Sequence, residues 1–368
     1  MTHPESIYQL ALTQVPQIGT VLARALSEKF ESAEAIFRAS KKMLCEVDGI
    51  SDIKASCIKS FKDFEVCESE HKFLEKHQIK LLFLTNEKYP KRLLNCYDPP
   101  TLLFYKGEAD LNAGKIVNII GTRSHSEYGK QLAEKLVETL SQHNILVISG
   151  MAFGIDTQAH KACVKYNVPT VGVLAHGLDT LYPPENAKLA RIMLDQSGGL
   201  LTEFWSGTKP DKHNFPTRNR VVAGLCDATI VVETDIKGGS MITAELAIGY
   251  NRDVFAFPGR VNDTKSKGCN HLIRLNKAAL ISNGDELLEA MNWLPQPEKK
   301  ARVQRSLFIE LTPQEKMIVD LLNANDQLHI DELNIKSGMN ASAAAGALLS
   351  LELQGVLLSL PGKLYRLA

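Results

Sequence analysis

From residue 116 onward, the sequence alternates short apolar runs with amphipathic segments, and this rhythm restricts the fold more than any other feature. Six runs predict strands: 116–121, 145–150, 168–175, 199–204, 228–234 and 253–259. Continuous Val, Ile and Leu content is typical of strands buried on both faces, and alternation with helices requires right-handed crossovers in a mostly parallel sheet. The sequence therefore predicts a doubly wound α/β domain over residues 79–293.

Smaller segments flank the predicted sheet. Residues 1–70 carry apolar side chains at helical spacing and predict a small helical domain. Its turns at 15–19 and 47–51 resemble those of helix-hairpin-helix modules, whose backbone amides approach phosphate. Ordinary glycine turns in a helical bundle explain them better, because few cations lie beside them. A proline-containing basic stretch at 294–310 predicts a linker. Residues 311–368 predict three helices followed by a β-ribbon, the order of a winged helix, and the first helix is predicted to start with Thr312 as N-cap and Pro313 at its first position.

The composition narrows the functional classes. Lys and Arg number 42, as do Asp and Glu, so an anionic partner must meet a local patch rather than a uniformly basic surface. The seven cysteines are scattered without a CxxC pair, which predicts free thiols and no metal site. No segment offers about 18 uninterrupted apolar residues, and the first residues lack signal-peptide features. We expect a cytoplasmic protein without a membrane partner.

Ligands of open α/β sheets bind beyond the carboxyl ends of the strands, and three loops there are candidate anion sites. After the first strand come Arg123 and Ser126, a good helix N-cap whose neighbouring amides can hold a phosphate. After the second comes Asp156, which is predicted to cap a helix. After the fifth, Gly238-Gly239-Ser240 forms an anion nest at a helix start. Ordinary turn chemistry explains each loop taken singly. Because all three loops lie at one sheet edge, a shared anion-binding site explains them better.

Residues 209–220, KPDKHNFPTRNR, gather cations on a predicted loop between the fourth and fifth strands, near that same edge. Phe215 offers a face on which a base can stack, worth about 1 to 3 kcal/mol per base. The cations that can hold phosphates are Lys212, Arg218 and Arg220. In the alternative interpretation, Phe215 belongs to the core and the arginines pair with Glu203 or Asp227.

Four motifs in this order resemble the DNA-processing protein A family, DprA or Smf: GTRSHSEYG, SGMAFGIDTQAH, FPTRNRVVAGLCDATIVVE and GGSMITAELAIGYNRDVFAFPG. The resemblance spans roughly residues 80–290. It implies an extended Rossmann-like fold that binds single-stranded DNA without sequence specificity, protects incoming strands in natural transformation, helps to load the RecA recombinase and forms homodimers. By position, it implies a strand-binding site made of Arg123, Lys212, Phe215, Arg218, Arg220, Gly239 and Ser240.

Two departures from the family pattern are modest. Gly-Gly-Ser stands at 238–240 where many members have Gly-Ser-Gly-Ser, which affects the geometry of the anion nest, and Cys226 stands where Ser is common.

The predicted winged helix has almost nothing with which to read base edges. Its third helix carries Glu352 as its only charge, with Asn340 and Gln354 at its ends. Residues 311–368 are net negative, so phosphate is weakly repelled. Protein contact or structural capping therefore fits this module better than duplex binding.

The leading hypothesis is a binding protein with no catalytic residue, cofactor or metal. The alternative is a nucleotide-binding enzyme, because residues 238–245 also resemble the PGGxGTxxE motif of nucleoside-monophosphate phosphoribohydrolases, with Glu245 at the place of the acid. Lys237 replaces the motif's proline, and this alternative leaves FPTRNR unexplained. A third hypothesis is a protein adaptor for which DNA is incidental.

Overall fold

The computed structural model describes residues 3–294 and 311–368. The predicted linker at 294–310 lies, except for its first residue, outside them. The chain divides into two compact units, Met1–Ile281 and Ser282–Ala368. The finer domain boundaries expected from the sequence stay predictions.

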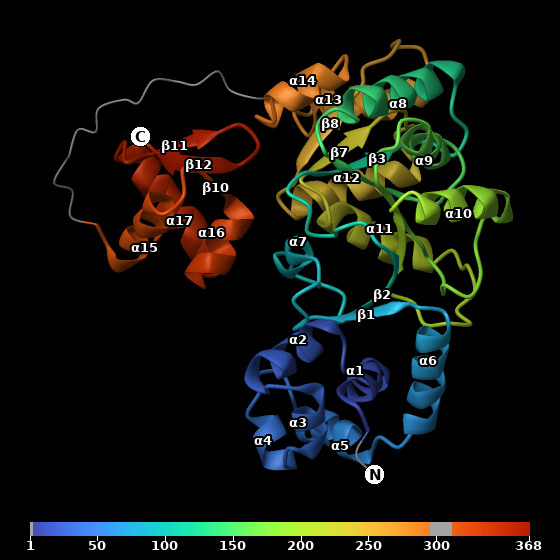
Figure 1. The fold of residues 1–368 in the computed structure, drawn as a ribbon. Helices are drawn as coiled ribbons and strands as arrows, with labels where there is room; N and C mark the ends of the chain where they lie inside the picture. Colours follow the sequence, from blue (N-terminus) through green and yellow to red (C-terminus); the bar gives the residue numbers. More distant parts are fainter. Residues whose placement is uncertain (1–2, 295–310) are drawn as a thin grey trace. The chain divides into compact units, whose positions relative to one another are not determined.

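The first unit begins with a helical segment (Figure 1). Serines start three of its helices: Ser32, Ser40 and Ser51 each accept a hydrogen bond from the amide three residues later. Apolar side chains at helical spacing, such as Leu10, Leu26, Ile36 and Leu44, are fully buried between the helices. The helices are α1 Glu5–Gln14, α2 Thr20–Lys29, α3 Ala33–Arg38, α4 Lys41–Cys45, α5 Asp52–Ser60 and α6 Phe64–Lys76.

The rest of this unit is built on a nine-stranded sheet with the order β1-β2-β6-β5-β4-β3-β7-β8-β9. Pairing from β6 through β5, β4, β3, β7 and β8 to β9 is parallel throughout, whereas β1 and β2 are antiparallel additions at one edge. The mostly parallel Rossmann-like sheet is confirmed. The strands are β1 Lys80–Phe83, β2 Leu102–Gly107, β3 Ile116–Ile120, β4 Leu146–Gly150, β5 Thr170–Val173, β6 Gly199–Thr202, β7 Ala228–Val231, β8 Asp253–Ala256 and β9 Ala279–Leu280.

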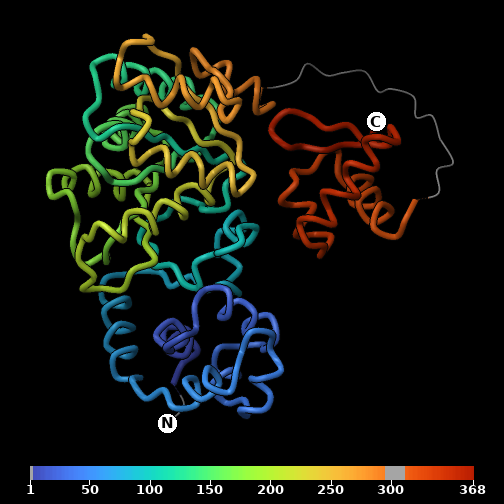
Figure 2. Tube along the Cα trace, turned by 180° about the vertical axis from the view of Figure 1, so that it is seen from behind, coloured from blue at the N-terminus to red at the C-terminus, as the bar shows by residue number. Residues whose placement is uncertain are grey.

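Helices cover both faces of the sheet. Both α9 and α11 contact β4 and β5, but α9 packs against α8 and α10 whereas α11 packs against α12, so the two groups lie on opposite faces. In Figure 2, seen from behind, the helical segment (blue) lies at one end of this unit and the part of the chain that carries β3 to β9 (green to orange) lies towards the other. The helices are α7 Lys91–Leu94, α8 Glu127–Leu140, α9 Ile155–Lys165, α10 Ala187–Asp195, α11 Asn214–Gly224, α12 Gly239–Gly249 and α13 Lys267–Arg274.

The direction of winding changes between β3 and β7. From β3 the chain adds β4, β5 and β6 on one side, and from β7 it adds β8 and β9 on the other. The loops that leave these two adjacent strands therefore diverge, and a crevice opens beyond their carboxyl ends.

The stretch predicted as a loop at 209–220 is largely helical, because α11 begins at Asn214. Pro216 does not stop it, since a helix leaves its first four amides without internal partners and Pro216 lies in that turn. Val221 and Val222 bury the inner face of the helix. Of the stretch 209–220, only residues 209–213 lie outside the helix and belong to the connection that leads into it.

Contacts from the helical segment fix the connection that follows β6. The buried Glu70 of α6 accepts a hydrogen bond from the Ser206 amide at 3.0 Å and another from the Ser206 hydroxyl. The Trp205 indole donates to the Thr13 hydroxyl at 3.3 Å. The segment that leads into α11 is thus fastened to α1 and α6.

The second unit holds α14, Gly284–Ala290, and a winged helix. The predicted start of α15 is confirmed, because Thr312 and Glu315 form a capping box with Pro313 in the first turn. The three-stranded sheet has the order β10-β12-β11. Its elements are α15 Pro313–Asn323, β10 Leu328–His329, α16 Ile330–Ser337, α17 Ala341–Leu353, β11 Leu357–Leu360 and β12 Leu364–Leu367.

Across the described residues, 3–294 and 311–368, no helix combines the length and the apolar character needed to cross a membrane.

Replacing Glu70 with Ala should loosen the connection after β6. The substitution leaves the polar groups of Ser206 without their acceptor, at a cost of about 1 to 3 kcal/mol. We expect faster amide hydrogen exchange in residues 205–212 and a lower melting temperature. Glu65→Ala, which removes an exposed carboxylate from the same helix, is the control; equal exchange in the two variants would contradict the assignment.

Candidate nucleic-acid interface

A cleft of about 520 Å³ lies at the carboxyl edge of the sheet, around the change of winding between β3 and β7. Its walls come from the loops after β3, β4 and β7 and from the first turns of α11 and α12. The structure brings six of the seven predicted site residues together here. They are Arg123, Lys212, Phe215, Arg218, Gly239 and Ser240.

An arginine stacked on an aromatic ring forms one wall of this cleft. The guanidinium carbon of Arg123 lies 5.1 Å from the centroid of the Phe215 ring. The centroid of the Tyr182 ring lies 6.3 Å from that of Phe215. Arg123 and Lys212 are both exposed, and Lys212 has no ion pair among the described residues. Two cations of a kind that can bind phosphate and an aromatic face that can stack therefore share one wall.

A buried arginine lies beneath them. Arg218 is only 6% exposed, its Nη1 donates to the Val173 carbonyl at 2.5 Å, and its Nε has no hydrogen-bond partner among the described residues. A Cβ at Gly150 would lie 2.0 Å from Nη1 and 2.6 Å from Oδ2 of Asp156. Only glycine at position 150 lets this guanidinium and this carboxyl approach the end of β4.

Asp156 titrates in an unusual range. Burial raises its pKa to about 7, although the charge of Arg218 and a hydrogen bond from the Ala152 amide lower it. Burial also lowers the pKa of Arg218. The cleft therefore carries more positive charge when Asp156 is protonated, which favours a phosphate.

The loop after β4 supports the Arg123 loop. Gly154 has φ +86°, and a Cβ there would lie 2.0 Å from the Thr122 carbonyl oxygen. The following amide, of Ile155, donates to that same oxygen at 3.1 Å. The start of α9 thus packs directly against the backbone that carries Arg123.

The expected phosphate site at the start of α8 is already occupied by the protein itself. Ser126 caps α8 as predicted, accepting from the Gly129 amide at 3.0 Å. The buried Glu233 carboxylate, however, accepts from the Ser126 amide at 2.9 Å and from its hydroxyl. The prediction that these amides hold a phosphate is therefore wrong, and Arg123 remains the candidate anion-binding group of this loop.

The Gly-Gly-Ser segment starts α12, with Gly238 as N-cap. Gly239 is exposed, whereas the buried Ser240 donates its hydroxyl to Thr234 at 2.7 Å. The side chain of Ser240 is thus used inside the protein. What the segment offers an anion is the first amides of the helix, which have no partner within it.

Arg220 is the predicted site residue that the structure places elsewhere. Its guanidinium pairs with the Glu203 carboxylate and donates to the Asp98 carbonyl, and the side chains of the ion pair are 12% and 13% exposed. In a helix, positions two apart point in nearly opposite directions, so Arg218 and Arg220 cannot share a face. The alternative interpretation, in which the arginines of this stretch pair with Glu203 or Asp227, is therefore correct for Arg220 and Glu203. Asp227 pairs with Arg92 at 2.7 Å instead.

Phe153 is a candidate functional residue that the sequence reasoning did not single out. It is 42% exposed in the loop after β4 and lines a small pocket together with Arg123, Phe215 and Arg218. The sequence signal that could have identified Phe153 is an aromatic residue next to a glycine, Gly154, in a loop at the carboxyl edge of the sheet.

Glu245, the acid of the enzyme alternative, does not line the cleft. It lies exposed on α12 and pairs with Lys277 at 2.7 Å. This placement gives the enzyme alternative no support.

Family models match most of the chain. One described as DNA recombination-mediator protein A matches residues 80–292, a DprA winged helix domain matches 305–363, and a SAM-like helix-hairpin-helix tandem matches 10–61. Protein Smf of Synechocystis sp. is 36% identical over 80% of this chain and 75% of its own length. DNA processing protein DprA of Streptococcus pneumoniae is 36% identical over 67% of this chain and 86% of its own length.

Two solved structures resemble the chain. The X-ray structure of DprA from Streptococcus pneumoniae has a TM-score of 0.66 and 31% identity, and the match covers 78% of this chain and 98% of that one. A structure described as giving insight into the single-stranded DNA binding mode of DNA processing protein A from Helicobacter pylori has a TM-score of 0.52 and 32% identity. That match covers 57% of this chain and 94% of the other.

Replacing Arg220 with Ala should destabilise the fold by about 3 to 5 kcal/mol, because a buried carboxylate loses its counterion. Denaturant unfolding measures the loss, and the added substitution Glu203→Gln should restore part of it. Arg191→Ala, which removes an exposed arginine, is the control. A loss below about 0.5 kcal/mol, typical of surface substitutions, would contradict the buried ion pair.

Replacing Asp156 with Asn should change how stability depends on pH. The folded-state pKa of about 7 lies above the ordinary value of 3.8, so the stabilising contribution of the retained proton is full below pH 3.8 and is lost as the pH rises through 7. Between about pH 5 and 8, the unfolding free energy of the wild type should fall relative to the variant by a few kcal/mol. Burial also raises the pKa of Glu203 to about 7, but that titration is common to both proteins. A constant difference would refute the assignment.

Proposed function

This chain belongs to the DNA recombination-mediator protein A family, the DprA and Smf proteins, and we propose that its cleft binds single-stranded DNA without reading the base sequence. The observation that carries the proposal is the stack of Arg123 on Phe215, with Lys212 on the same wall and Arg218 beneath. Cations hold phosphates of any sequence, and an aromatic face accepts any base.

The strand must be single, because a base inside a duplex cannot present its face to Phe215. The similar Helicobacter pylori protein, whose structure is described by its single-stranded DNA binding mode, supports this choice of ligand. The Gly239 and Ser240 amides at the start of α12 suit a second phosphate of the same strand.

We propose the wider role from the family. The protein takes part in DNA processing during natural transformation, where it covers incoming strands in the cytoplasm and helps to load RecA recombinase, and it works as a homodimer. Its contribution is binding rather than catalysis: the charged and aromatic side chains of the cleft fit a bound strand, and the acid of the rival enzyme motif, Glu245, pairs with Lys277.

Substitutions in the cleft should separate phosphate contacts from stacking. Arg123→Ala and Lys212→Ala should weaken binding of a labelled oligothymidine about equally for all sequences and flatten the salt dependence by roughly 0.7 per lost phosphate contact. Phe215→Ala should cost about 1 to 3 kcal/mol with little change in salt dependence. Fluorescence anisotropy at several salt concentrations measures both, with a duplex of equal length as comparison.

Lys135→Ala removes an exposed lysine on α8 that does not line the cleft, and it should bind like the wild type. Equal weak binding of single strand and duplex by the wild type, or unchanged affinity in all three cleft variants, would refute the proposed function.

A further inference from the structure

A second groove, of about 780 Å³, lies between α9 and α10 and adjoins the cleft. Arg123 lines both hollows. Phe153 lines the groove together with the small pocket that contains Phe215 and Arg218. A ligand that passes over these two side chains can therefore lie in both hollows at once.

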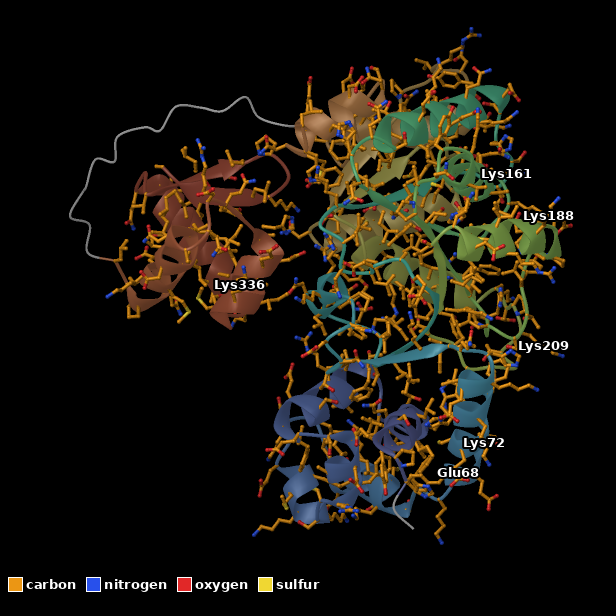
Figure 3. All side chains as sticks on the ribbon, in the orientation of Figure 1. Glu68, Lys72, Lys161, Lys188, Lys209 and Lys336 are labelled. Carbon is orange, nitrogen blue, oxygen red and sulfur yellow. The ribbon has the colours of Figure 1, made fainter. Side chains whose placement is uncertain are left out.

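The walls of this groove carry cations without counterions. Lys161 on α9 and Lys188 on α10 are exposed, and neither forms an ion pair among the described residues. Figure 3 shows both side chains projecting from the same edge of the unit. By contrast, Lys165, one turn after Lys161, pairs with Glu134 at 2.5 Å. Among the described residues that line the groove, Glu185 supplies the only carboxylate, so the charge of the groove favours an anion.

Apolar side chains complete the lining of the groove. Val164, Leu189 and Ile192 contribute aliphatic surface, and Phe153 contributes an aromatic ring that is 42% exposed. Cations together with apolar and aromatic surface match a single strand, whose phosphates and unpaired bases need different partners within one groove. A duplex buries its bases in its own stack and would leave this apolar surface unused.

We propose that the groove between α9 and α10 is a second binding segment for single-stranded DNA, continuous with the cleft. The inference rests on the proposed function and extends it. The strand leaves the Phe215 face, passes Phe153 and runs between Lys161 and Lys188, which hold its phosphates. Long strands then make contacts that short strands cannot reach.

The test compares oligothymidines of about 5 and about 20 nucleotides, which lie near the lower end and above the upper end of the site sizes of about 4 to 16 nucleotides seen in other single-strand binders. In the variant K161A/K188A, affinity for the long strand should fall on the order of tenfold at about 0.1 M salt. The salt slope should flatten by roughly 1.4, for two lost contacts at about 0.7 each. Affinity for the short strand should stay as in the wild type, and K161R/K188R should restore the long-strand affinity because it keeps both charges.

The control K88A/K135A removes the same net charge from two exposed lysines that line neither hollow. The inference is overturned if K161A/K188A binds the long strand like the wild type, if it loses equal affinity for both lengths, or if the control loses as much. A wild type that binds neither oligonucleotide overturns the proposed function as well, whereas the first three outcomes leave that function intact.

Discussion

Every parallel strand from β3 to β8 ends at one edge of the sheet, and the chain reverses its direction of winding between β3 and β7. Right-handed crossovers make this reversal place helices on opposite faces, so the loops after the two central strands must diverge. The cleft exists because of that divergence. The Arg123 loop, the start of α11 and the start of α12 come from distant parts of the sequence, and each reaches the cleft because its preceding strand ends there.

The interior of the cleft is fixed by close contacts. Gly150 lets Arg218 and Asp156 approach the end of β4, and Gly154 lets the next turn pack against the Arg123 backbone. Below the pKa of Asp156, its carboxyl is neutral and no longer offsets the positive charge of the buried guanidinium. A cation held beneath an aromatic wall needs little reorganisation when a strand binds, which lowers the entropic cost of association.

The cations of residues 209–220 can lie close together in a chain of zero net charge because α11 directs them to different faces. Phe215, Arg218 and Asn219 lie on one face of the helix and line the cleft, with Val222 one turn further on. Arg220 points the other way and neutralises the buried Glu203. The same basic stretch therefore combines the proposed ligand binding with a contribution to stability, while α1 and α6 hold the connection that precedes it in place.

The sequence by itself determined the strands β3 to β8, the mostly parallel sheet that they form, the sheet edge with the candidate site, and the helix starts at Ser126 and Thr312. Hydrophobic periodicity and capping act over a few residues, so a local pattern is enough to predict them. Six of the seven site residues that the sequence predicted line the cleft. Only the tertiary structure decided that the Glu233 carboxylate occupies the start of α8, that Arg220 points away from the cleft, and that Phe153 lines both the groove and the small pocket beside Phe215. These outcomes depend on pairs far apart in the chain, such as Ser126 and Glu233, whose meeting is set by how the crossovers pack rather than by any local pattern.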